Sequence, residues 1–400
     1  MSWKRASASL LLLTLTISLL ILVSPNAQQQ IVSINETNAH KTSQQISPSL
    51  VIRSNSDFAD LGVTGAGTRA DPYIIRNLVI SVENRTCIDV RDTTAYFIIF
   101  NCILKTGDQD PAIEFTNVAN GQILRCEVRG GSNGIEIYNS IDCSVANTTI
   151  YGSWNAVHLD LTTNCTVSFS RLSSSLRGIL LEGADFCRIV NNSIYANKIS
   201  GVDLAAFSDN NTVIENSIGW NGISLGPEAN AFDYGEDNHF DDNESIGNTW
   251  SDYNGTAPYG ILGTSGAVDS FPGLLVDTQA PLLNGLDDTA IDVETPGNTL
   301  TWQVSDEFPN NYSVQIDHGL ETFSPWNGDD ITVNLDNLPV GTHTYVLTVY
   351  DGAGNTASDQ VVVNVVSFIL GGIGTELVMI ASGITVVSFV VIILVVRKLS

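Results

Sequence analysis

The sequence predicts an all-β chain in which a parallel β-solenoid is followed by a β-sandwich and one membrane-spanning helix. Three observations support this: an aliphatic repeat of 21 to 25 residues, a later segment of alternating strands and turns, and a long apolar run near the C-terminus. A chain of 400 residues with 43% hydrophobic content has enough apolar material for two or three folded units.

The N-terminal residues have the pattern of a secretory signal. Lys4 and Arg5 precede an uncharged run over residues 6–23, and a short small-residue segment ends at Ala27. We therefore expect residues 1–27 to form a signal peptide and residues 28–50 a linker. Pro25 is atypical so close to a cleavage site, so an uncleaved anchor is the alternative.

Three aliphatic columns organise the middle of the chain. β-Branched side chains favour strands, and three short strands per repeat describe one coil of a parallel solenoid. The signature of a leucine-rich repeat, which has a similar period, is absent. We expect coils with caps at both ends over residues 51–272. The columns are Ile88, Ile113, Ile135, Val157, Ile179, Val202 and Ile223; Ile98, Ile123, Val145, Val167, Ile189 and Val213; and Ile103, Val128, Ile150, Leu172, Ile194 and Ile218.

Small polar residues and cysteines recur in register at the expected bends. One polar residue per coil predicts a ladder of hydrogen bonds between coils. Cys143, Cys165 and Cys187 stack in the same way and predict a buried thiol ladder, with a single disulfide among them or a Cys102–Cys126 bond as the alternative. The polar ladder comprises Asn101, Cys126, Thr148, Ser170, Asn192 and Asn216.

Four short motifs stand at the front cap, on the first coil and near the end of the repeat. They are Gly67-Thr68, Asp71-Pro72-Tyr73-Ile74-Ile75, the strand at 94–99 before Asn101-Cys102, and Gly247-Asn248-Thr249-Trp250-Ser251-Asp252-Tyr253. Together they resemble the right-handed parallel β-helix proteins of the NosD-like family over about residues 50–272. The resemblance implies that fold, whose members act as polysaccharide lyases, glycosidases, binding modules or surface stalks.

The namesake role of this family is copper delivery to nitrous oxide reductase. The two methionines of the chain are Met1 and Met379, which lie in the expected signal and the expected membrane span. A soft thioether copper site outside the cell is therefore ruled out, and a copper-handling role is the weakest of the functions considered.

Residues 277–366 have the strand alternation and turns of a separate β-unit. Strands are expected near 299–304, 331–335, 344–350 and 361–366, and Tyr345 near the start of a late strand resembles a tyrosine corner. The unit looks like the immunoglobulin-like repeats of bacterial and archaeal surface proteins. We expect it to act as a spacer, with an independent ligand site as the alternative.

The last apolar run predicts a membrane anchor over residues 371–396. Residues 377–396 are uncharged, and Arg397 and Lys398 follow at once. This matches the ~20 residues that cross a bilayer and the positive-inside rule. We therefore expect a single-pass cell-membrane protein with an extracellular bulk and a cytoplasmic tail at 397–400.

The charge distribution excludes one class of partner. The formal net charge is −26, and residues 199–396 contain no Lys or Arg. Nucleic acid is therefore not an expected partner, because phosphate binding needs clustered bases.

An acidic face of the solenoid carries the candidate chemistry. Glu136 and His158 follow their first-column residues by one position, whereas Asp160 and Glu182 follow theirs by three, so all four point outward. Neighbouring coils are about 5 Å apart, which allows the roughly 5 to 9.5 Å carboxylate separations of glycosidases. A merely solvated acidic face is the alternative that we favour.

Outward aromatic residues are the candidates for stacking on a carbohydrate ligand. They are Tyr138, Tyr151, Trp154, Tyr195 and Trp220, of which we single out Tyr138, Trp154 and Trp220. Each could instead pack on its own coil.

Calcium is the one cofactor that the sequence suggests. The region after the repeat is rich in acidic residues, and oxygen ligands on loops suit Ca²⁺. The five histidines show no metal-pair spacing, so zinc is not expected. The calcium candidates are Asp233, Glu236, Asp237, Asp241, Asp242 and Asp252.

These observations predict a secreted, membrane-anchored surface protein for recognition or scaffolding, with extracellular polysaccharide as the candidate ligand. A carbohydrate-active enzyme using the acidic face is the alternative. Asn-x-Ser/Thr triplets predict glycosylation, most readily at Asn254 and Asn311.

Overall fold

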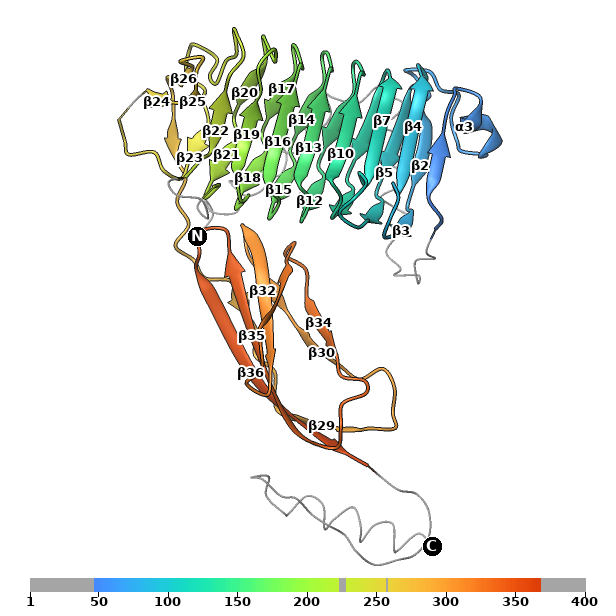
Figure 1. Cartoon of the computed structure of the whole chain (residues 1–400), viewed down its shortest axis with the longest axis vertical. Helices are drawn as coiled ribbons and strands as arrows, with labels where there is room; N and C mark the ends of the chain where they lie inside the picture. Colours follow the sequence, from blue (N-terminus) through green and yellow to red (C-terminus); the bar gives the residue numbers. More distant parts are fainter. Residues whose placement is uncertain (1–46, 223–227, 257, 368–400) are drawn as a thin grey trace, which may run out of the picture.

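The computed structural model describes residues 47–222, 228–256 and 258–367, which form a β-rod joined to a second β-unit (Figure 1). The expected signal at 1–27, the expected span at 371–396 and Ile223 lie outside these residues. Across the described part of the chain, no helix has the length and apolarity needed to cross a membrane.

Three parallel sheets form the rod, and every coil contributes strands to them in rotation. Sheet 1 runs along one side of the rod, and its outer face carries the candidate chemistry. Its nine strands are β1 (Leu50–Ile52), β4 (Ile88–Thr93), β7 (Ile113–Val118), β10 (Asn133–Tyr138), β13 (Asn155–Asp160), β16 (Arg177–Glu182), β19 (Ser200–Leu204), β22 (Ala231–Asp233) and β25 (Leu262–Gly263).

Sheets 2 and 3 close the coils. Sheet 2 contains β2 (Tyr73–Arg76), β5 (Phe97–Phe100), β8 (Gly121–Leu124), β11 (Ser144–Ala146), β14 (Thr166–Ser168), β17 (Arg188–Val190) and β20 (Thr212–Ile214). Sheet 3 contains β3 (Val79–Ser81), β6 (Ile103–Lys105), β9 (Glu127–Arg129), β12 (Thr149–Tyr151), β15 (Arg171–Ser173), β18 (Ser193–Tyr195), β21 (Ser217–Gly219), β23 (Thr249–Trp250) and β27 (Gly273–Leu274).

The predicted aliphatic columns fill the rod, with two corrections at its ends. In the first coil, Ile99 and Leu104 occupy the inward positions that the sequence assigned to Ile98 and Ile103. The run Phe97–Phe100 is apolar throughout, so periodicity could not distinguish its faces. At the other end, Val202 pairs with Ala231, because the last coils are longer than the repeat.

Both ends of the rod are covered. The short helix α3 (Asp57–Asp60) places Phe58 over the first coil, where it stacks on Tyr73 with ring centroids 4.8 Å apart. At the far end Trp250 is fully buried and stacks on Tyr259. The antiparallel pair β24 (Tyr259–Gly260) and β26 (Val268–Asp269) lies beside it. These aromatics close a core that would otherwise end in open coils.

Asparagine ladders join successive coils in the later half of the rod. Asn216 Oδ1 accepts hydrogen bonds from the backbone N–H and the side chain of Asn192, and its Nδ2 donates to the Ile189 carbonyl. Asn197 and Asn221 repeat the pattern at the next bend. The predicted polar ladder is therefore confirmed here, although in the first coil Cys102 takes the place that the sequence gave to Asn101.

The six cysteines are all free and buried. Burial raises the pKa of Cys87 to about 12, and contact with the Cys143 thiol raises the pKa of Cys165 to about 12. Cys143, Cys165 and Cys187 stand in register on consecutive coils, as the thiol ladder predicted.

We expect these thiols to resist alkylation in the folded protein, because the reactive species is the thiolate and buried thiols rarely form it. Iodoacetamide at about pH 8 without reductant should add no group to the native chain, and six groups after unfolding in denaturant. Mass spectrometry counts the adducts. An unfolded, unreduced chain that takes up no label would mean three disulfides and would overturn the ladder.

The second unit packs two β-layers face to face. One layer is a five-stranded sheet, in which β35 and β36 supply Tyr345, Leu347 and Val361 to the core, and Trp302 of the facing layer packs against them. The strands of the whole unit are β28 (Leu282–Leu283), β29 (Thr289–Asp292), β30 (Thr299–Trp302), β31 (Val304–Ser305), β32 (Pro309–Ile316), β33 (Thr322–Pro325), β34 (Ile331–Asn334), β35 (Gly341–Asp351) and β36 (Thr356–Val366). We call this unit the sandwich.

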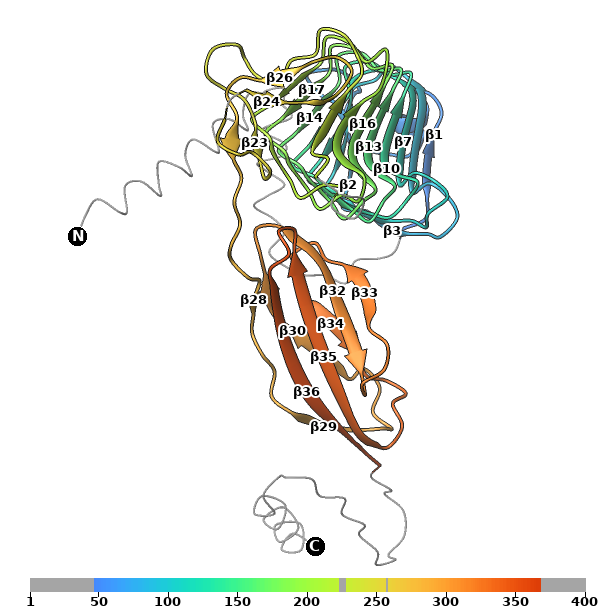
Figure 2. The same ribbon diagram turned by 60° about the vertical axis from the view of Figure 1, so that its left-hand side comes forward.

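The sandwich abuts the outer face of sheet 3 (Figure 2). Phe308 lies between Tyr195 and Trp220 of the rod, with ring centroids 5.3 and 5.2 Å away. The Tyr195 hydroxyl donates to the Pro309 carbonyl, and Arg171 donates to the carbonyls of Asn327 and Glu307. The two units therefore share a mixed aromatic and polar interface, which we call the junction.

Candidate functional site

The outward rows of sheet 1 place the predicted chemistry on one face. Strand register aligns Glu136 with His158, and Tyr138 with Asp160 and then Glu182. Alternation along each strand sends these side chains out while Ile135, Val157 and Ile179 fill the core. We call the face formed by β10, β13 and β16 the acidic face.

Charge interactions within the acidic face centre on His158. Its Nε2 lies 3.4 Å from Glu182 Oε2, and its side chain is 12% exposed whereas that of Glu182 is 60% exposed. Burial raises the pKa of Asp160; the nearby His158 opposes this shift, and Glu182 and Glu136 add to it.

Two shielded polar atoms on this face lack hydrogen-bond partners. Asn155 donates from Nδ2 to Asn133 Oδ1, and Asn133 in turn donates to Glu136, so all three side chains lie on the outer side. Asn155 Oδ1 and His158 Nε2 nevertheless make no hydrogen bond. Buried polar atoms are usually paired, so these two atoms are exceptions on this face.

The arginines that flank the face are already engaged. Arg91 donates to Asp89 and, through Nη2, to both carboxylate oxygens of Glu114. Arg177 lies 3.2 Å from Asp203. Both guanidinium groups are therefore held by carboxylates of the rod.

Two of the five predicted stacking residues, Tyr151 and Tyr195, are buried, so the expectation that they are available to stack on a ligand was wrong. The other three lie in different surroundings. Tyr138 is 38% exposed at the end of β10, and Trp154 is 51% exposed just before β13, at the opposite edge of sheet 1. A six-residue strand is roughly 17 Å long, so these two rings stand far apart. Trp220 packs on Phe308 in the junction and is half-buried, which leaves Tyr138 as the aromatic on the acidic face itself.

The predicted calcium ligands of the rear cap are mostly bound within the protein. Asp242 Oδ1 accepts three backbone N–H groups, which lower its pKa. Asp241 accepts from Asn243 and Ser270, and Asp252 from Asn230 and Tyr259. Asp233 Oδ1 accepts from Gly235 and Asn238, whereas its buried Oδ2 has no partner. Glu236 and Asp237 are exposed.

These cap carboxylates do not gather into a three-ligand group within the described residues. The one such group in that part of the chain forms at the junction and consists of Asp277, Asp306 and Asp351. Calcium binding at the cap stays a prediction.

Comparison with known proteins assigns the rod to a fold and not to an activity. Residues 61–218 match the family described as "Right handed beta helix region". No curated protein of known function matches the chain. The matched segment spans the coils from the front cap to β21, so the solenoid is a right-handed parallel β-helix.

Proposed function

We propose that this protein is a membrane-anchored cell-surface β-helix whose acidic face recognises an extracellular polysaccharide. The NosD-like motifs favour a β-helix of that group, and the sandwich, with its late-strand Tyr345, suits an immunoglobulin-like spacer. The apolar run at 371–396 would anchor both units to the membrane, with the bulk of the chain outside the cell.

The observation that carries the binding proposal is the outward row in which the exposed ring of Tyr138 stands in register with Asp160 and then Glu182, with His158 on the adjacent row. Sugar hydroxyls donate and accept hydrogen bonds, and their C–H faces stack on aromatic rings. A flat sheet edged by carboxylates and an aromatic ring offers all of these contacts along a polymer. A drug-sized small molecule would instead need a concave pocket that buries most of its surface.

Binding is tested with the full-length protein in detergent on an array of polysaccharides. Replacing Tyr138 by alanine should weaken binding about tenfold, the size of a hot-spot contact. His158→Ala should also weaken it, whereas Glu244→Gln, a change at an exposed position of the cap away from the acidic face, should leave it unchanged. Equal affinity of the wild type, Tyr138→Ala and His158→Ala proteins would show that any polymer binds elsewhere.

A second function, glycoside hydrolysis, is favoured by one observation. Asp160, with its raised pKa, stands in register beside the exposed Glu182, as an acid and a base or nucleophile would. Loss of either carboxyl should then abolish turnover while much of the affinity remains. We expect no cleavage by the wild type; cleavage lost in both Asp160→Asn and Glu182→Gln would establish the enzyme instead.

A further inference from the structure

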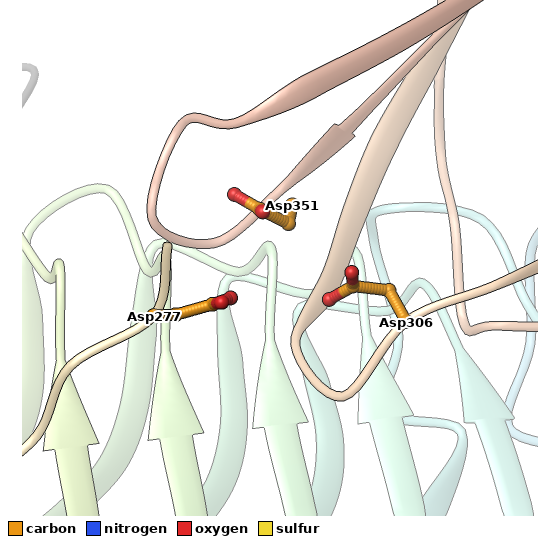
Figure 3. A group of neighbouring side chains, drawn as sticks. All are labelled: Asp277, Asp306 and Asp351. Atoms are coloured by element: carbon orange, nitrogen blue, oxygen red, sulfur yellow. The ribbon is translucent and has the colours of Figure 1, made fainter. Parts of the chain in front are cut away.

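Three aspartates from separate segments meet at the junction (Figure 3). Asp277 lies in the linker between β27 and β28, Asp306 in the loop between β31 and β32, and Asp351 at the end of β35. One carboxylate oxygen of each lies within 4.8 Å of the others. The side chains of Asp277 and Asp306 point toward each other.

This cluster leaves a shielded carboxylate oxygen without a partner. Asp277 Oδ1 accepts a hydrogen bond from the Gln279 N–H, but Oδ2, which is hidden from solvent, accepts none. Asp351 is 1% exposed, and its two oxygens are bonded only to Asn355. Burying a carboxylate oxygen without a compensating contact is unfavourable, so the arrangement favours an additional ligand between the three groups.

That ligand must supply positive charge. One carboxylate oxygen of each aspartate lies within 4.8 Å of the others, so three acidic groups converge on one place. Among the described residues, no Lys, Arg or His side chain forms an ion pair with any of the three aspartates. The nearby Arg171 directs its guanidinium to the carbonyls of Asn327 and Glu307 instead.

We propose that Asp277, Asp306 and Asp351 bind one calcium ion at the junction. Three carboxylate oxygens form a hard ligand set, which excludes metals that prefer sulfur or nitrogen. Separations within 4.8 Å allow the three oxygens to surround one Ca²⁺ at roughly 2.4 Å each, and Ca²⁺ tolerates irregular ligand geometry whereas Mg²⁺ demands a near-ideal octahedron. Loop and linker backbone can adjust to the larger, more flexible calcium shell.

Calcium at this position would couple the linker to the interface between the two units. Asp306 Oδ1 accepts the N–H of Phe308, the residue that packs between Tyr195 and Trp220. Asp277 belongs to the segment that leaves the rod. An ion shared by both residues therefore holds the linker against the sandwich and fixes the loop that carries Phe308.

Calorimetric titration of CaCl₂ into the full-length, chelator-treated protein tests the site. The wild type should bind one more calcium ion than Asp306→Asn or Asp277→Asn, or bind it at least about tenfold more tightly, since ligand charge sets affinity. Both changes keep the shape of the side chain. Asp287→Asn removes the same charge from an exposed position of the sandwich and should bind calcium as the wild type does.

The titration also distinguishes this site from other acidic regions. Calcium bound at the rear cap would persist in both junction variants, so only the difference in stoichiometry or affinity between the wild type and these variants reports on the junction. If Asp306→Asn proves unstable, Asp277→Asn decides, because Asp277 lies outside both hydrophobic cores. Equal stoichiometry and affinity in the wild type and Asp277→Asn would overturn the site, and equal affinity for MgCl₂ would overturn its assignment to calcium.

Discussion

Replacing Asn216 by alanine should lower the free energy of unfolding of the β-helix by about 2–4 kcal/mol. The substitution removes the acceptor for the Asn192 backbone N–H and the donor to the Ile189 carbonyl, both in the interior of the coil stack. Each buried group left unsatisfied costs about 1–3 kcal/mol. Denaturant unfolding followed by circular dichroism measures the loss.

A neighbouring substitution provides the matched control. Ser193 lies on β18, one residue beyond Asn192, and its side chain is only partly buried. Ser193→Ala should change stability by less than about 0.5 kcal/mol, as surface substitutions usually do. Similar losses for Asn216→Ala and Ser193→Ala would mean that the ladder is structurally incidental.

Replacing Phe308 by alanine should separate the two units, because it should lower the free energy that stabilises the junction by about 2–4 kcal/mol. Phe308 is 5% exposed and contacts Tyr195 and Trp220 through edge-to-face ring geometry. Its removal leaves a cavity at an interface whose other contacts are mostly single hydrogen bonds. Trp220 fluorescence should shift to the red, and small-angle scattering should report a broader distribution of shapes.

Phe323→Ala serves as the control, because Phe323 is 58% exposed on β33 of the same sandwich. It should leave both the emission of Trp220 and the scattering curve unchanged. Unaltered scattering in Phe308→Ala would show that the polar contacts of Arg171, Ser174 and Tyr195 hold the units together without the aromatic trio.

Most of the rod could be predicted from its repeat period and from the residue types at fixed positions in each repeat. A coil repeats every 22 residues over its regular part, and β-branched residues at fixed offsets can satisfy that period only as stacked strands. The same alternation fixed which side chains face outward, so the rows of Glu136 with His158 and of Asp160 with Glu182 followed from spacing alone. The predicted inward columns were wrong only at Phe97–Phe100, where the run is apolar throughout, and after Val202, where the coil length changes.

The sequence by itself therefore determined the solenoid, its ladders and the composition of its acidic face. Only the tertiary structure decided how the sandwich lies against sheet 3, and with it the burial of Tyr195, the partial burial of Trp220 and the meeting of Asp277, Asp306 and Asp351. Those aspartates are 29 and 45 residues apart in sequence and share no repeat. Their proximity depends on the path of the linker between the two hydrophobic cores, and no periodic pattern in the sequence encodes that path.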